Sequence, residues 1–243
     1  MKKLFLISSY FLFFSWISLS WTPKAEETPI VVPVSITPVV YTTTEEKAAF
    51  LYTDLHLQEK GLSKDAFDYA YKGYDRLVRK GIVANSNYLT ICDFSQSSNN
   101  KRLYVIDLTN NDLVINTYVA HGRNSGTEFA NRFSNKPSSL QSSLGFYVTE
   151  DTYTGEHGLS LKIRGLEKGF NDKALGRNIV IHGADYIGGS WLNYNDYMGR
   201  SYGCPAVPLE ERDEIISTIK NGTCLFIYHP SMKYLKGSKI LNG

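Results

Sequence analysis

The sequence predicts an α+β domain that is mainly β, and three observations lead to this class. Short runs rich in Val, Ile, Leu and Tyr recur from residue 87 to residue 183, separated by Asn, Gly, Ser and Asp clusters, as is typical of strands. Helical periodicity is confined to residues 44–80 and to a stretch after Pro208. With 243 residues, of which 42% are hydrophobic, the chain can fill one core.

The first 25 residues have the pattern of an export signal. Lys2 and Lys3 precede an apolar run from Leu4 to Trp21, and small residues near the end of this run suit cleavage by a signal peptidase. A run of this length is also close to that of a membrane span. We therefore expect residues 1–25 to be a signal peptide or an N-terminal anchor, and the protein to be exported to the periplasm or cell envelope.

An extended linker and a first helix are expected next. Residues 26–42 alternate Pro, Thr, Val and Glu without helical period, which favours a linker. Thr43 and Glu46 have the spacing of a capping box, which predicts a helix over residues 44–59. Gly61 suits the end of that helix.

A second helix is predicted from its cap and its periodicity. Ser63 suits the N-cap, and Gly81 suits the end. Residues 43–85 are therefore expected to be a helical pair packed on a domain of residues 86–235. The apolar face of the second helix comprises Phe67, Ala70, Tyr71, Tyr74, Leu77 and Val78.

Strand patterns dominate the remainder of the chain. Pro208 is expected to open a late helix that Gly222 ends, before a closing strand. The expected strands cover residues 87–94, 102–108, 112–120, 144–150, 159–163, 178–183 and 224–229.

Charge and cysteine content exclude some classes of function. Lys and Arg total 26 and Asp and Glu total 24, so the formal net charge of +2 creates no strong field for nucleic acid or anionic lipid. Three cysteines are too few for a disulfide framework. Cys92 and Cys224 lie in apolar strand runs and are expected to be small buried hydrophobes, with a 92–224 disulfide as the alternative.

Cys204 lies instead in a stretch dense in turn residues, where a thiol can act as a nucleophile. His182 ends an apolar strand run and is the candidate base, and Gly183 lets the chain turn directly after it. A tight turn at Gly203 is expected to leave the backbone N–H groups of residues 203 and 204 unpaired, as an oxyanion hole requires. A structural histidine that ends a strand is the alternative role of His182.

These residues also resemble a known family. Ile181-His182-Gly183 followed by Ser201-Tyr202-Gly203-Cys204 resembles the H-G-x(n)-S-H-G-C signature of YkuD-like L,D-transpeptidase catalytic domains. More closely, GRSYGCPA resembles the G-R-S-x-G-C-P-A of murein L,D-transpeptidase catalytic domain proteins. The resemblance covers most of residues 61–229, and it implies a β-sandwich or barrel as the catalytic domain.

The resemblance implies a reaction on peptidoglycan stem peptides. The Cys204 thiolate would attack the carbonyl of the third residue of a stem tetrapeptide and release D-alanine. An amine of a neighbouring stem, or water in a carboxypeptidase reaction, would then resolve the thioacyl enzyme. The family implies no metal and no organic cofactor, and we expect a monomer without a nucleic-acid partner.

Two positions depart from the wider family, which often has His directly before the Gly-Cys pair and Arg two residues after Cys. Tyr202 and Ala206 occupy these positions here. If that Arg holds a substrate carboxylate, another cation must replace it; Arg123 is the first candidate, and Arg200 is the second unless it fixes the cysteine loop by binding carbonyls. The expected substrate-binding residues are Arg123, Asn124, Arg200, Ser201 and Tyr202, with Gly183 and Gly203 as backbone groups of the oxyanion site.

Three other interpretations remain open. The aromatic residues Trp191, Tyr194 and Tyr197 form either a lid over an extended peptide or the packing beneath a loop. A zinc-dependent murein peptidase would need distant histidines, namely His121, His157, His182 and His229, to converge without a His-Glu-x-x-His motif. A non-catalytic peptidoglycan-binding module of the same fold is the third interpretation, for which Tyr202 and Ala206 are the signs.

Overall fold

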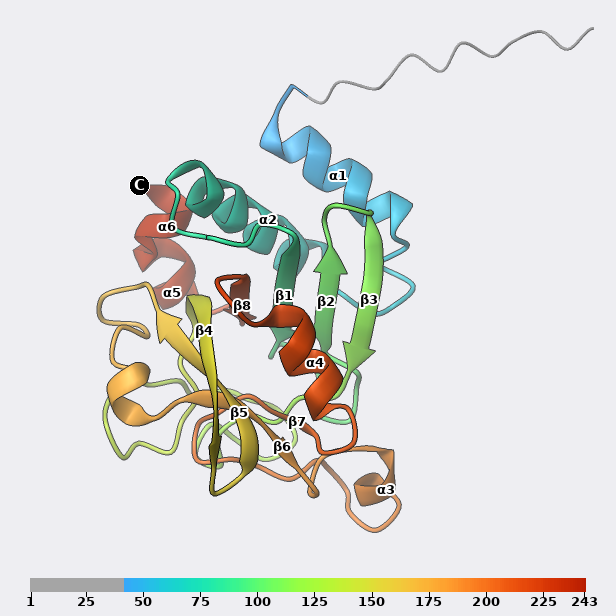
Figure 1. Cartoon of the computed structure of the whole chain (residues 1–243), viewed down its shortest axis with the longest axis vertical. Helices are drawn as coiled ribbons and strands as arrows, with labels where there is room; N and C mark the ends of the chain where they lie inside the picture. Colours follow the sequence, from blue (N-terminus) through green and yellow to red (C-terminus); the bar gives the residue numbers. More distant parts are fainter. Residues whose placement is uncertain (1–41) are drawn as a thin grey trace, which may run out of the picture. The chain divides into compact units, whose positions relative to one another are not determined.

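One eight-stranded sheet, in the order β3-β2-β1-β8-β4-β5-β6-β7, organises the protein (Figure 1). The computed structural model describes residues 42–243, so the predicted signal or anchor of residues 1–25 and nearly all of the predicted linker lie outside the described residues. The strands are β1 (Tyr88–Asp93), β2 (Leu103–Asp107), β3 (Asp112–Thr117), β4 (Gly145–Gly155), β5 (Gly158–Gly165), β6 (Val180–Ala184), β7 (Ala206–Pro208) and β8 (Cys224–Tyr228). The predicted α+β, mainly β class is confirmed.

The sheet is mixed and strongly bent. β1 pairs in parallel with β8 and antiparallel with β2, whereas β4 and β5 form a long antiparallel hairpin. Beyond this hairpin, the β5-β6-β7 part crosses beneath the β1-β2-β3 part, which gives a barrel-like sandwich (Figure 1). The parallel pairing of β6 with β7 sets His182 opposite Ala206 and so brings two distant stretches of sequence together.

Helix α1 (Thr44–Asp54) begins with the predicted capping box. The Thr43 hydroxyl accepts from the backbone N–H of Glu46, and the Glu46 carboxylate accepts from the backbone N–H of Thr43. The helix ends at Asp54 instead of residue 59. His56 adopts a positive φ of 50°, which is incompatible with a continued right-handed helix.

Helix α2 (Lys64–Arg79) packs against β1 and β8. Ser63 caps it, as predicted, by accepting from the N–H of Ala66. Gly73 allows a close approach to the sheet, because a Cβ atom there would lie 1.9 Å from Cζ of Phe146. The division between a helical pair and a domain of residues 86–235 stays a prediction.

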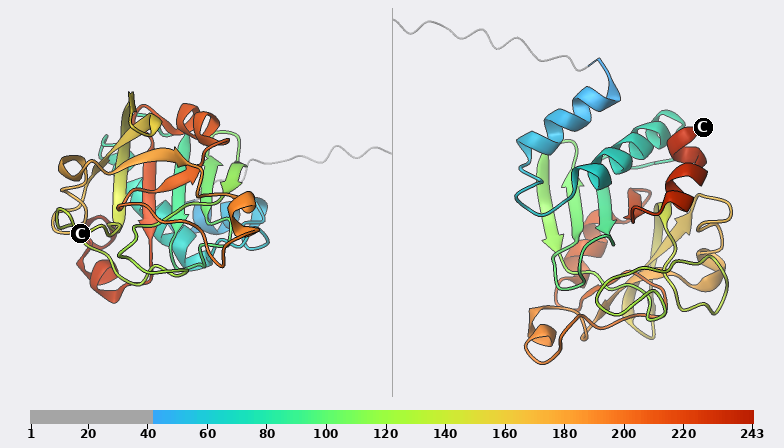
Figure 2. Two further views of the ribbon diagram at one scale, coloured as in Figure 1. Left: turned by 90° about the horizontal axis from the view of Figure 1, so that it is seen from below. Right: turned by 180° about the vertical axis from the view of Figure 1, so that it is seen from behind.

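Helix α4 (Arg212–Ile219) covers the other face of the sheet (Figure 2). It begins four residues later than predicted, because residues 206–208 form β7. The short helices η1 (Leu175–Arg177), α3 (Gly189–Leu192), α5 (Met232–Gly237) and α6 (Lys239–Asn242) were not expected from the sequence. Glu167 links the C-terminal helices to β4. Its carboxylate accepts hydrogen bonds from the hydroxyls of Tyr234 and Ser238 and from the N–H of Phe146 in β4.

Cys92 and Cys224 are buried, and both are free thiols. The prediction that they serve as core hydrophobes is confirmed. Between residues 42 and 243, no helix combines the length and the apolar character that a membrane crossing requires.

Candidate active site

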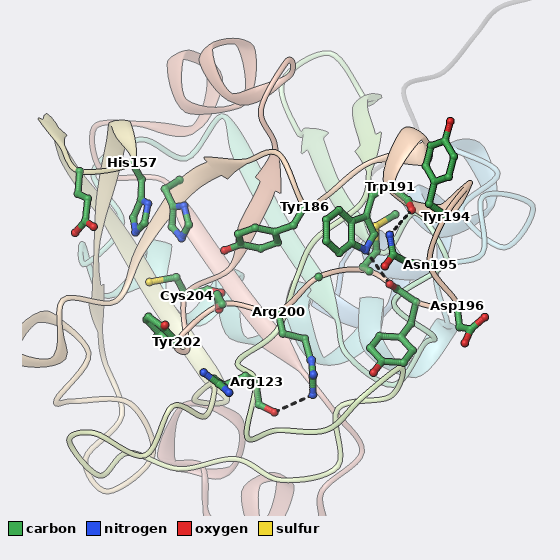
Figure 3. A pocket seen from close by; sticks show the side chains of 16 residues that line it. Arg123, His157, Tyr186, Trp191, Tyr194, Asn195, Asp196, Arg200, Tyr202 and Cys204 are labelled. Atoms are coloured by element: carbon green, nitrogen blue, oxygen red, sulfur yellow. Dashed lines mark hydrogen bonds between the residues drawn. The ribbon is translucent and has the colours of Figure 1, made fainter.

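A cleft of about 830 Å³ lies where β6, the Cys204 loop and the tip of the β4–β5 hairpin meet (Figure 3). His182 and Cys204 both line it. Their proximity follows from the sheet, because Ala206, two residues after Cys204, pairs with His182 across β6 and β7. The structure thus brings the two residues that the sequence singled out into one cleft.

The Cys204 thiol contacts two backbone groups of the chain segment before β6 and at its start. Its Sγ accepts from the N–H of Val180 at 3.5 Å and donates to the carbonyl of Asn178 at 3.6 Å. Burial raises the pKa of the thiol, while the Val180 N–H and the Arg177 guanidinium partly offset that rise. A thiol in this state needs a base before it can act as a nucleophile near neutral pH.

His182 is 3% exposed, and its ring is held by its own backbone neighbour. Nδ1 lies 3.0 Å from the carbonyl of Gly183. A carbonyl can only accept, so Nδ1 carries the proton and Nε2 keeps its lone pair. Burial lowers the pKa of His182, which keeps the ring neutral at pH 7. A neutral ring with a free Nε2 can accept a proton.

His157 at the hairpin tip lies against His182. The two imidazole rings are stacked, with centroids 4.3 Å apart and planes inclined by 19°. Hairpin geometry brings His157 there, since Ser160 on β5 pairs with His182 on β6. The sequence named His157 only as a distant zinc candidate, and no local pattern signals its contact with His182.

The loop before Cys204 differs from the predicted oxyanion geometry. The N–H of Gly203 donates to the Ser201 hydroxyl at 3.0 Å, and that hydroxyl donates to the carbonyl of Cys204 at 2.6 Å. The prediction of an unpaired N–H at Gly203 was therefore wrong, because the serine side chain closes a local turn. Within residues 42–243, no backbone carbonyl accepts from the N–H of Cys204.

Gly183 does not form the predicted turn. It lies within β6, which continues through Ala184, and pairs with Val207 of β7. A Cβ atom at Gly183 would come within 2.9 Å of Arg212 and 3.0 Å of Leu209, so the site has no space for a side chain. Its contribution to the cleft is the carbonyl that orients His182.

Arg123 and Tyr202 form the wall of the cleft beside Cys204 (Figure 3). The Arg123 guanidinium lies over the Tyr202 ring at 5.8 Å, and the Tyr202 side chain is 67% exposed. Arg123 forms no ion pair with any carboxylate of residues 42–243. Its charge therefore remains available to a ligand.

Arg200 and Asn124 are used in loop contacts. The Arg200 guanidinium donates to the carbonyls of Arg123 and Gly126 at 3.3 and 3.0 Å, as the structural alternative for this residue predicted. The Asn124 side chain donates to the carbonyl of Ser139 and does not line the cleft. Both residues shape the loop that presents Arg123.

Arg177 stabilises the floor beneath Cys204. It donates to the carbonyls of Ser134 and Gln141 at 2.9 and 2.7 Å and to the hydroxyls of Ser139 and Ser143. All these acceptors lie in the loop of residues 134–143. Both terminal nitrogens of the guanidinium are thus bound by the protein, and its charge acts on the nearby thiol.

Of the four histidines considered for zinc, His157 and His182 are stacked on each other, whereas His121 and His229 lie elsewhere. His121 is buried beside Arg102, at 2.8 Å, and burial together with that cation lowers its pKa to about 3. His229 lies against Phe133, with ring centroids 4.9 Å apart and planes inclined by 50°, and is not part of the cleft. Across residues 42–243, no three His, Cys, Asp or Glu side chains are grouped as metal ligands would be.

Residues 58–228 match the family model of the L,D-transpeptidase catalytic domain. The chain belongs to this family. The predicted resemblance is confirmed, and with it the barrel-like sandwich of the catalytic domain. A search of curated proteins gives no match to the chain.

Similar solved structures include three whose sequences have diverged widely from this L,D-transpeptidase family member. An L,D-transpeptidase from Mycobacterium smegmatis shares 10% identity, covering 59% of each chain at a TM-score of 0.36. One from Mycobacterium tuberculosis shares 11%, covering 59% of this chain and 58% of the other at 0.34. The helical cell shape determining protein Pgp2 from Campylobacter jejuni shares 13%, covering 67% and 55% at 0.37. The chain thus spans less than two thirds of the length of each of these structures.

Proposed function

We propose that this protein is a peptidoglycan L,D-transpeptidase with Cys204 as nucleophile and His182 as general base. One observation carries the proposal: the Gly183 carbonyl holds the proton on Nδ1 of His182 and leaves Nε2 free, in the cleft that Cys204 also lines. A buried thiol with a raised pKa requires such a base.

In the acylation step, one proton is transferred and the amide bond to D-alanine is replaced by a thioester bond to Cys204. Nε2 of His182 takes the proton of the Cys204 thiol as Sγ attacks the carbonyl carbon of the third residue of a stem tetrapeptide. The tetrahedral intermediate then expels the amine of D-alanine, which receives that proton from His182. The products are free D-alanine and a thioester on Cys204.

The second step restores the enzyme. An amine of a neighbouring stem gives its proton to His182 while its nitrogen attacks the thioester carbon, and Sγ leaves as a thiolate that His182 reprotonates. The new bond is an amide that cross-links two stems. Water in place of the amine yields a tripeptide, which is the L,D-carboxypeptidase outcome.

Backbone and loop residues prepare the site for this chemistry. The N–H of Cys204, from which no backbone carbonyl of residues 42–243 accepts, is the donor we assign to the developing oxyanion, because the N–H of Gly203 is bound to Ser201. Arg123, which forms no ion pair with a carboxylate of residues 42–243, is the cation that we assign to a stem carboxylate. Tyr202 holds its guanidinium from one side.

The remaining proposals concern cellular context. The predicted signal or anchor of residues 1–25 fits an exported enzyme of the periplasm or cell envelope. Peptidoglycan stem peptides are the proposed partners, and we propose that the protein acts as a monomer without a cofactor.

Incubation of the full chain with a disaccharide-tetrapeptide, followed by mass analysis of the products, tests the function. Transpeptidation gives dimers and free D-alanine, whereas hydrolysis gives tripeptide. The Cys204→Ala chain should give neither product, and a chelator should leave the reaction unchanged. Chelator-sensitive turnover that survives Cys204→Ala would contradict the thiol mechanism and favour the zinc peptidase. Tight murein binding without any product would favour the binding module.

A further inference from the structure

The cleft extends beyond Cys204 to a segment that the reaction at the thiol does not use. This segment, residues 191–196, lies between β6 and the Cys204 loop, and Figure 3 places Trp191, Tyr194, Asn195 and Asp196 together at the end of the cleft remote from His157. Tyr194 is 90% exposed. An aromatic side chain this exposed beside a cleft contributes little to the core and requires another explanation.

Hydrogen bonds fix the segment in place. The indole N–H of Trp191 donates to the carbonyl of Tyr197 at 3.0 Å, and the Asn195 side chain donates to the carbonyl of Trp191 at 2.9 Å. From a separate part of the chain, Asn99 donates to the carbonyl of Asp196 at 2.8 Å. These bonds organise the backbone that carries the exposed ring in advance of any ligand.

A small apolar cluster supports the segment from below. Met198 is fully buried and packs with Ile187 and Ala184, and Trp191 packs on the same cluster. The Trp191 and Tyr186 rings meet edge to face, with centroids 6.4 Å apart. Residues 191–196 therefore form a platform that this cluster supports. Of the aromatic residues considered for a lid, Trp191 packs partly beneath the loop, and Tyr194 does not.

Charge distinguishes the two ends of the cleft. The arginines that line it are Arg123, beside Cys204, and Arg200, whose guanidinium binds backbone carbonyls. Residues 191–196 include no arginine or lysine, and the Asp196 carboxylate forms no ion pair within residues 42–243. Arg200 lies over the neighbouring Tyr197 ring at 5.5 Å, but its guanidinium donates to backbone carbonyls. A stem peptide, which carries carboxylates, suits the Arg123 end and is poorly matched to the Asp196 end.

We propose that residues 191–196 bind a pyranose ring of the glycan strand that carries the stem acylated at Cys204. A pyranose presents a face of C–H bonds, which packs on the electron-rich face of an aromatic ring such as Tyr194. Its hydroxyls can donate to the Asp196 carboxylate and to the free side-chain oxygen of Asn195. The inference rests on the proposed function and adds that the sugar contributes to recognition.

Binding to the full chain carrying Cys204→Ala, measured by calorimetry, tests the platform without turnover. The probes are a sugar-free tetrapeptide, the disaccharide-tetrapeptide and a β-1,4-linked N-acetylglucosamine tetramer. We expect the disaccharide-tetrapeptide to bind tighter than the sugar-free peptide. Adding Tyr194→Ala should weaken binding of the disaccharide-tetrapeptide by about five- to tenfold, abolish measurable binding of the sugar tetramer, and leave the sugar-free peptide unchanged.

Two further variants serve as controls. Tyr194→Phe keeps the ring and should retain binding of both sugar-containing probes. Tyr153→Ala removes an exposed tyrosine of β4 that does not line the cleft, and should change nothing. Because Tyr194 is exposed, its substitution does not threaten folding.

The outcomes separate this inference from the proposed function. Equal weakening of the peptide with and without sugar would show that the platform binds peptide, and no weakening of either would show that it binds nothing; both results overturn the inference. Turnover of the disaccharide-tetrapeptide by the active chain with no dependence on Tyr194 would leave the function standing and the platform refuted. Loss of sugar binding in Tyr194→Ala, alongside an active chain that fails to turn over, would support the platform and refute the cysteine chemistry.

Discussion

The imidazole of His157 is stacked on the imidazole of His182, at a centroid distance of 4.3 Å and an interplanar angle of 19°. His157 is exposed on the tip of the β4–β5 hairpin, whereas His182 is buried. The stack restrains the His182 ring about the hydrogen bond to Gly183. In the proposed mechanism, His157 is thus a positioning residue that keeps Nε2 of His182 directed into the cleft.

Replacing His157 separates its packing role from its charge. His157→Ala should lower kcat/KM by about tenfold, because the base loses its ring support. His157→Phe keeps a stacked ring and should recover most of that loss. His56 is exposed and does not line the cleft, so His56→Ala serves as the control and should leave kcat/KM unchanged.

The acid limb of the pH profile of kcat/KM tests the charge of His157, because the packing of its ring alone would not shift that limb. Burial lowers the pKa of His182 most, the Gly183 carbonyl partly reverses this, and the charge of His157 lowers it further. Removing that charge in His157→Phe should raise the pKa of His182. A base must be neutral to act, so the acid limb of kcat/KM should move to higher pH. An unmoved limb would show that His157 has no electrostatic effect on the base.

Cys204 should be the one reactive thiol of the native protein. Burial raises the pKa of Cys92 to about 12 and raises that of Cys224 further, while Cys204 borders the cleft. Alkylation by a small neutral reagent, followed by peptide mapping, should therefore label residue 204 first. Earlier labelling of Cys224 would contradict the assignment of the nucleophile.

His182→Ala should slow the alkylation of Cys204 most strongly near neutral pH. The raised pKa of the thiol leaves little thiolate there without a base. The ratio of wild-type to variant rates should fall toward one as the pH rises through the pKa of Cys204, because the thiolate then forms unaided. An unchanged rate at pH 7 would make His182 structural.

Gly73 offers a stability prediction independent of the site. A Cβ atom at this position would lie 1.9 Å from Cζ of Phe146, whose ring stacks on Phe226 at 4.2 Å. Gly73→Ala should therefore destabilise the protein by about 1–3 kcal/mol, although alanine favours helix by about 1 kcal/mol. Thermal unfolding of Gly73→Ala beside Lys72→Ala, at an exposed position of the same helix, measures the effect. An equal or higher Tm for Gly73→Ala would show that α2 shifts to make space.

Local patterns in the sequence predicted the elements that carry their own signals. The capping residues Thr43 and Ser63 were found at the starts of α1 and α2, because caps act within one turn of the helix. β7 was missed because three residues that end in Pro208 carry no strand period; the strand exists through its pairing with β6. Because β7 was not predicted, the predicted helix began at Pro208, four residues before the start of α4.

The site was predictable only where the family signature reaches. That signature identified Cys204 and His182, which a parallel strand pair brings together. It says nothing of His157, which reaches His182 through the β4–β5 hairpin, nor of which arginine is free. Sequence alone does not separate Arg177 from Arg123. They differ because the loop of residues 134–143 accepts from both terminal nitrogens of Arg177, whereas Arg123 pairs with no carboxylate of residues 42–243.

Arg123 should serve binding of the donor stem more than chemistry at the thiol. Its guanidinium faces the cleft without a carboxylate partner among residues 42–243, and Ala206 occupies the position where the wider family often has an arginine. A bidentate contact with a stem carboxylate contributes ~1.5–3 kcal/mol, so Arg123→Ala should lower kcat/KM on a tetrapeptide donor by about ten- to a hundredfold. Arg123→Lys should recover part of this, since an ammonium cannot form the two-pronged contact.

The alkylation rate of Cys204 distinguishes substrate binding from support of the loop. Arg123→Ala should leave that rate unchanged, because a small neutral reagent needs no carboxylate site. Arg200→Ala should instead slow both reactions, since its guanidinium holds the carbonyls of Arg123 and Gly126 and thereby the loop beside Cys204. Equal losses in both assays for Arg123→Ala would make Arg123 a structural residue of the loop. An unchanged kcat/KM would leave the stem carboxylate to a cation other than Arg123.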